Sequence, residues 1–134
     1  MANKIFLNPE GYIEVVIDGE QTFMTIDNMK YDAIDMLGQL QKEGKPRLGL
    51  VDLTKQANYT PDTNKAAMQN LEALNYEKVA MFGASTVLTE ISNALILAMG
   101  RAHNTKVFKN REEAVKWLLE KSNQTPTDQK QLQQ

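Results

Sequence analysis

The sequence predicts an α/β protein built on a single mixed sheet, in which an antiparallel N-terminal meander is followed by parallel βαβ units with about four helices. Two observations lead to this fold class. The apolar run 79–83 ends at a glycine and precedes an apolar helix, a short strand and an amphipathic helix, a pattern typical of parallel strands buried on both faces. Before it, short apolar segments separated by turn residues at 8–11 and 18–19 predict antiparallel strands.

The first part of the chain is predicted to hold three strands and one helix. The strands cover residues 4–7, 12–17 and 22–26, and Asp18-Gly19 is expected to form the hairpin between the last two, because glycine tolerates positive φ. Asp27 or Asn28 can cap the following helix, which extends to about residue 43. Its apolar residues fall on one face of about 100° and form the predicted buried stripe. These residues are Met29, Ala33, Met36, Leu37 and Leu40.

Strands and helices alternate through the rest of the chain. We predict strands at 47–53, 79–83 and 106–108, with helices at about 61–74, 87–99 and 110–121. Thr60-Pro61-Asp62 is typical of a helix start, with a cap, a proline in the first turn and an acidic residue after it. We expect residues 1–121 to form one domain. Residues 122–134, in which Leu132 is the one apolar side chain, are expected to be a disordered tail.

The composition excludes several classes of function. The 15 Lys and Arg residues and 17 Asp and Glu residues form no long run of either sign, so no nucleic-acid binding is predicted. Cysteine is absent and His103 is the one histidine, so we expect no disulfide, metal site or cofactor. No set of titratable residues converges in the pattern, which favours a non-enzymatic protein. The N-terminal apolar segment is too short for a signal peptide, so we expect a cytoplasmic location.

Four segments carry a resemblance to a known family. The segments LGLVDL (48–53), YEKVAMFG (76–83), VF (107–108) and REEAVKWL (111–118) resemble the SpoIIAA-like branch of the STAS superfamily, the domains of sulfate transporters and anti-sigma-factor antagonists. The likeness covers roughly residues 10–120. It implies a STAS fold and a small domain that forms a homodimer. It also implies that the partner is an apolar small molecule, a lipid or membrane surface, or a regulatory protein.

The same resemblance implies candidate phosphoacceptors. In anti-sigma-factor antagonists, a serine in an Asp-Ser motif is phosphorylated at the start of the helix that follows the Asp-Leu strand. Thr63 follows Asp62 and matches that serine, although the glycine that usually comes next is replaced by Asn64. Thr60 is the second candidate, and its other interpretation is that of a helix cap.

A ligand site is predicted at the carboxyl ends of the parallel strands, where open α/β sheets bind their ligands. Asp52 and Thr54 end one strand, while Ser85 and Thr86 follow the next. Ser85 has two interpretations, since it can cap the following helix or bind an anion there. The candidate ligand-binding residues are therefore these four.

The helix at 87–99 is predicted to have a broad core face made of Val87, Leu88, Ile91, Ala94, Leu95, Ala98 and Met99. Ile96 and Leu97 fall outside that face, which predicts a contact with a second subunit, a lipid or another helix of the chain. The predicted function is a non-enzymatic binding or regulatory domain whose helices open over a fixed sheet. The alternative is a phospho-regulated interaction switch that uses Thr63 or Thr60.

Overall fold

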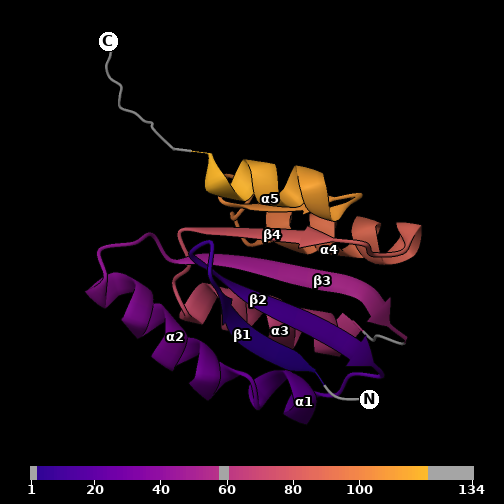
Figure 1. Ribbon diagram of the computed structural model, residues 1–134. Helices are drawn as coiled ribbons and strands as arrows, with labels where there is room; N and C mark the ends of the chain where they lie inside the picture. The colour runs from indigo at the N-terminus through magenta and orange to yellow at the C-terminus, as the bar shows by residue number, and fades with distance from the viewer. Residues whose placement is uncertain (1–2, 58–60, 121–134) are drawn as a thin grey trace.

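The computed structural model describes residues 3–57 and 61–120, which form one five-stranded sheet with helices on both faces. The strands lie in the order of the sequence, β1-β2-β3-β4-β5. β1 pairs with β2 in antiparallel fashion, and the other three pairings are parallel. The predicted mixed α/β sheet, with its antiparallel start and parallel βαβ units, is therefore confirmed (Figure 1).

The strands are β1 (Lys4–Asn8), β2 (Tyr12–Gly19), β3 (Leu48–Gln56), β4 (Lys78–Phe82) and β5 (Thr105–Phe108). The helices are α1 (Phe23–Asp27), α2 (Lys30–Lys42), α3 (Pro61–Ala73), α4 (Thr86–Ala98) and α5 (Arg111–Leu119). None of the helices in the described part of the chain has the length and apolar character that a bilayer span requires.

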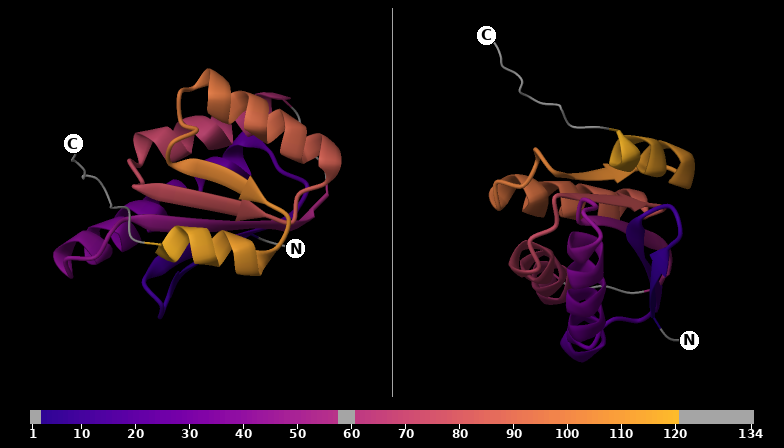
Figure 2. Two further views of the ribbon diagram at one scale, coloured as in Figure 1. Left: turned by 90° about the horizontal axis from the view of Figure 1, so that it is seen from above. Right: turned by 60° about the vertical axis from the view of Figure 1, so that its left-hand side comes forward.

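The helices divide unequally between the two faces of the sheet. α5 lies alone on one face, and α1 to α4 lie on the other (Figures 1 and 2). Strand side chains alternate between the faces, so each central strand contributes to two cores. In β3, Leu48 and Leu50 pack in the smaller core under α5, while Val51 and Leu53 pack in the larger core under the other helices.

The predicted third strand at 22–26 is wrong, and so is the hairpin at Asp18-Gly19. β2 continues through Gly19, where it pairs with Gln56 of β3. Thr22 then caps α1 in a reciprocal capping box with Thr25. The β-branched and aromatic side chains of this segment favour a strand, but two side-chain to backbone hydrogen bonds and the burial of Ile26 stabilise a helical turn instead.

The predicted core face of α4 is right for Leu88, Leu95 and Met99, which pack against the larger core, and wrong for Val87, Ala94 and Ala98, which are exposed. Its buried residues are Leu88, Ser92 and Ile96, which form a single row at a spacing of four. Ile96 is 3% exposed and belongs to the core, whereas Leu97 is 73% exposed, as expected. Most residues of α4 are apolar, so periodicity alone defines no single face, and the polar Ser92 lies in the middle of the buried row.

The other helices bury the faces that the sequence predicts. In α2, Ala33, Leu37 and Leu40 are buried, and Met36 and the preceding Met29 pack against the same core. In α3, Met68 is buried and Ala67 and Leu71 are partly buried around it, with Leu74 just beyond the end of the helix. The predicted disordered tail at 122–134 and the candidate Thr60 lie outside the described residues.

Candidate functional site

A cavity of about 100 Å³ lies between the sheet and the helices α1 to α4. Its floor is the larger-core face of β1 to β4, and its walls are side chains from all four helices. The residues around it include Val15, Ile17, Ile26, Ala33, Val51, Leu53, Ala67, Leu71 and Leu88. The surface that this cavity offers to a guest molecule is therefore mainly apolar.

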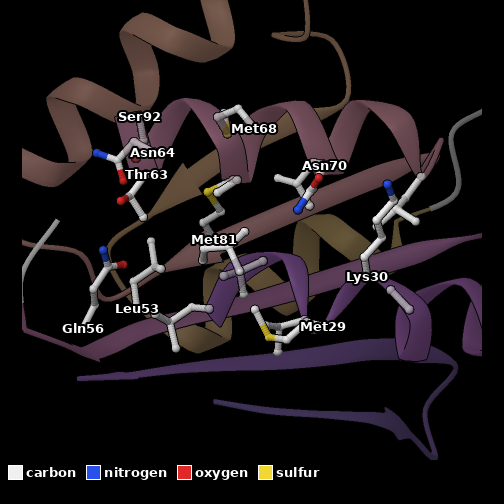
Figure 3. Close-up of a pocket in the computed structure, with 18 of the residues that line it drawn as sticks. Met29, Lys30, Leu53, Gln56, Thr63, Asn64, Met68, Asn70, Met81 and Ser92 are labelled. Carbon is white, nitrogen blue, oxygen red and sulfur yellow. The ribbon is translucent and has the colours of Figure 1, made fainter. Parts of the chain in front are cut away.

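Three methionines lie in the middle of the cavity, namely Met29, Met68 and Met81 (Figure 3). They come from the start of α2, from α3 and from β4, so they approach the space from different sides. Methionine is unbranched and has a polarisable sulfur, which lets it repack around guests of different shape. The centre of the cavity is thus its most adaptable part.

Polar side chains lie at the two ends of the cavity. Figure 3 shows Gln56, Thr63, Asn64 and Ser92 at one end, and Lys30 and Asn70 at the other. The first group is held where β3 ends, in the first turn of α3 and in α4. Thr63, Asn64 and Ser92 are all buried. The cavity therefore has an apolar middle and one deeply buried polar end.

Asn64 is the residue at this end whose polar group is left unsatisfied. Its side chain is 9% exposed, and its Nδ2 atom has no hydrogen-bond partner among the described residues. A buried amide that makes no hydrogen bond costs free energy, so such groups are rare in folded proteins. An unpaired donor beside a cavity indicates a place where an acceptor atom can bind.

Tyr76 forms part of the cavity wall and is held by tight packing. Its ring is 4% exposed, and burial raises the pKa of its hydroxyl to about 12. The ring lies directly over Gly49 of β3, where an added Cβ would come 2.7 Å from Tyr76 Cε1. Gly49 is therefore required by the close approach of this ring.

The predicted strand-end residues do not surround this cavity. Asp52 and Thr54 lie close together, because Asp52 Oδ1 accepts hydrogen bonds from the Thr54 amide at 2.9 Å and from its hydroxyl at 2.6 Å. Ser85 caps α4 by accepting a hydrogen bond from the Leu88 amide, and Thr86 is exposed. None of the four is among the cavity residues. A ligand for them stays a prediction.

The opposite face of the sheet holds a polar cluster that fixes α5. The Arg111 guanidinium donates to both carboxylate oxygens of the buried Glu14, at 2.6 and 2.8 Å, and holds the pKa of that carboxyl below its usual value. Lys78 donates to the carbonyl oxygens of Trp117 and Glu120 at the other end of α5, 2.9 Å each. Both contacts are structural.

Within the described residues, no group of three histidine or carboxylate side chains could hold a metal ion.

Comparison with solved structures identifies the fold. The structure of SpoIIAA, an anti-sigma-factor antagonist, in its unphosphorylated form matches with a TM-score of 0.58, covering 85% of this chain and 94% of that one at 9% identity. This chain has the SpoIIAA-like fold. A protein of the DUF3478 family from Shewanella loihica PV-4, also with a SpoIIAA-like fold, matches with a TM-score of 0.56 and 16% identity, covering 87% and 92% of the two chains. No family model and no curated protein matches the sequence.

Within this SpoIIAA-like fold, Thr63 is placed at the start of α3, as the resemblance implies, but its side chain is only 8% exposed. It lies at the polar end of the cavity rather than on the surface (Figure 3). A kinase would reach its hydroxyl only after the first turn of α3 opened. Whether Thr63 accepts a phosphoryl group stays a prediction.

The amino-acid pattern carries weak signals for the cavity. It predicts buried faces on α2 and α3, with Met68 on the second of them. Asn64 and Ser92 were missed, because a polar residue on an expected helix is normally assigned to its solvent face. The usable signal was their spacing: Ser92 lies four residues from both Leu88 and Ile96, and Asn64 lies four residues before Met68.

Proposed function

We propose that this SpoIIAA-like domain is a non-enzymatic binding domain that holds a small apolar molecule in the cavity between its helices and its sheet. The observation that carries the proposal is the cavity itself, about 100 Å³ of space surrounded by apolar side chains and three methionines. Folded interiors are normally packed to the density of organic crystals, so space of this size is unusual without a role.

The size of the cavity limits the size of the guest. A cavity of about 150 Å³ in another protein binds benzene. The present space of about 100 Å³ would take a guest somewhat smaller than benzene unless the helices move. A compact hydrocarbon chain bearing one small polar group fits this limit.

Binding would act on the rest of the molecule through α3. This helix packs against its neighbours α1 and α4, and the cavity lies beneath it on the sheet side. A guest that fills the space would hold α3 and α1 in place, whereas an empty cavity would leave them easier to displace. Regulation in this proposal is a change in the position of α1 and α3 over a fixed sheet.

Native mass spectrometry of the freshly purified protein, compared with its denatured mass, tests this function. We expect the native protein to carry a small extra mass that denaturation removes. Ala67 borders the cavity, so Ala67→Phe should fill the space and abolish the extra mass. Ala73→Phe is the matched control on the same helix, because Ala73 is exposed. An extra mass retained unchanged in Ala67→Phe would place the ligand elsewhere and reject the proposal.

A further inference from the structure

We propose that the cavity binds its guest in one orientation, with Asn64 donating a hydrogen bond to an uncharged carbonyl oxygen of a small apolar molecule. The hydrocarbon part of that molecule lies against Met68 and Met81. This inference rests on the proposed function and adds to it the chemical class of the ligand: a small amide, ketone or ester, rather than a hydrocarbon or a carboxylic acid.

The need for an acceptor comes from Asn64. Asn64 is only 9% exposed, and its Nδ2 atom has no hydrogen-bond partner among the described residues. The side chain borders the cavity at the end where α3 begins (Figure 3). An amide N–H donates, so the atom that satisfies it must be an acceptor, and a carbonyl oxygen is the acceptor that amides meet most often in proteins.

The uncharged character of the ligand follows from the other groups at the same end. Gln56, Thr63 and Ser92 lie there with Asn64, and all of them are neutral. Among the described residues that border the cavity, the one cation is Lys30, and Figure 3 shows it at the opposite end. Burying a carboxylate without an ion partner costs far more free energy than burying a carbonyl group, so this end favours the neutral oxygen.

The apolar part of the ligand follows from the middle of the cavity. Beyond Asn64 along α3, the next buried side chain is that of Met68, one helical turn away, and Met81 of β4 lies beside it in the view of Figure 3. A molecule whose oxygen is bound at Asn64 therefore extends its hydrocarbon chain over methionine side chains, which can adjust to it.

Three probes of equal chain length, all with fewer non-hydrogen atoms than benzene, separate the candidate chemistries: propanamide, propanoate and n-butane. The protein is labelled with carbon-13 at its methionine methyl groups, and each probe is titrated while the methyl resonances are followed by NMR. Met68 and Met81 report on the cavity, and Met24, which is 61% exposed, serves as an internal control. We expect propanamide to bind more tightly than propanoate and to shift Met68 and Met81 but not Met24.

The role of Asn64 is tested with Asn64→Leu, which keeps the approximate size of the side chain and removes the donor. Relative to n-butane, the dissociation constant of propanamide should rise about tenfold in this variant. Removing an unpaired buried donor should also leave the thermal midpoint of the ligand-free protein unchanged or higher. Asn64→Ala, which removes the donor without adding bulk, provides the same comparison if the leucine variant does not fold.

Gln69→Leu is the matched control, since Gln69 lies on α3 but is exposed and does not border the cavity. It should leave the ratio of the propanamide and n-butane constants unchanged. An equal ratio in the native protein and in Asn64→Leu would overturn the inference, because an ordered water would then suffice to satisfy Asn64. Tighter binding of propanoate than of propanamide would also overturn it. If no probe shifts Met68 or Met81, the proposed function fails together with the inference.

Discussion

At the residue scale, the two faces of the sheet differ in whether a buried polar side chain has its hydrogen-bond partners. On the α5 face, the carboxylate of Glu14 is satisfied by Arg111 and by the Asn8 side chain amide. On the opposite face, Asn64 keeps an unpaired Nδ2 beside a cavity. The first arrangement stabilises the fold, and the second leaves a binding group available.

The Glu14–Arg111 contact predicts a defined pH dependence of stability. The folded-state pKa of Glu14 is lowered, first by its hydrogen bond from Arg111, from the ordinary value of 4.5. Its contribution is therefore present above pH 4.5 and is lost as the pH falls through the lower folded-state pKa. Glu14→Gln should reduce the free energy of unfolding by about 1–3 kcal/mol at pH 7. Urea unfolding between neutral and acidic pH measures both effects.

The matched control for Glu14→Gln is Glu112→Gln, an exposed carboxylate in the first turn of α5. The difference in stability between native protein and Glu14→Gln should shrink toward zero in acid, where Glu14 is protonated in both states. A difference that stays constant from neutral to acidic pH would contradict the assignment.

Two glycines with different surroundings give a second test. Gly49→Ala would place Cβ 2.7 Å from the buried Tyr76 ring, so it should destabilise the fold by about 1–3 kcal/mol. Gly38 lies in α2 and has nothing within 4 Å of an added Cβ. Gly38→Ala should therefore stabilise the protein by about 0.5–1 kcal/mol. Chemical denaturation of both variants measures the changes, and a loss of stability in Gly38→Ala alone would reverse the expected order.

At the scale of the elements, α4 exposes more apolar surface than a helix of its length needs for its own packing. Val87 is 59% exposed and Leu97 is 73% exposed, although the same helix buries Leu88 and Ile96. Leu97 is one of the two residues for which the sequence predicts a contact with a second subunit, a lipid or another helix, and its exposure leaves it accessible. A contact of Leu97 with a second copy of the chain stays a prediction.

Leu97→Ser should then lower the dimer fraction measured by sedimentation velocity over a range of protein concentrations. Ala98→Ser is the control, because Ala98 is also exposed on α4 and its replacement by serine removes little apolar area. Equal sedimentation of the native protein and both variants would show that Leu97 contributes nothing to self-association.

The elements also show how far the sequence determines the structure. α2, α3 and α5 were predictable because their apolar residues repeat on one face only. The segment 22–26 was not, since five residues rich in β-branched and aromatic side chains are compatible with a strand and with a capped turn of helix. α4 was predicted as a helix but with a buried face that is only partly right, because apolar residues surround its axis and Ser92 is buried among them.

At the scale of the whole molecule, the sheet lies between two helical layers of different size. The strand order follows the sequence, so each crossover helix lies next to the one before it, and α1 to α4 cover a single face (Figures 1 and 2). That layer encloses the cavity, while α5 alone covers the opposite face. The spacing of Asn64 and Ser92 on their helices indicates that both are buried, but no local pattern in the sequence specifies how closely several helices approach the sheet together. The cavity itself could therefore not be predicted.

The central claim is that the space between the sheet and α3 accepts an apolar guest. A crystal of the protein under xenon pressure tests it most directly, because xenon binds apolar cavities without needing a hydrogen bond. We predict a xenon atom between Met68 and Met81, and its loss in Ala67→Phe with retention in Ala73→Phe. A crystal in which side chains fill this space and xenon binds nowhere beneath α3 would contradict the account.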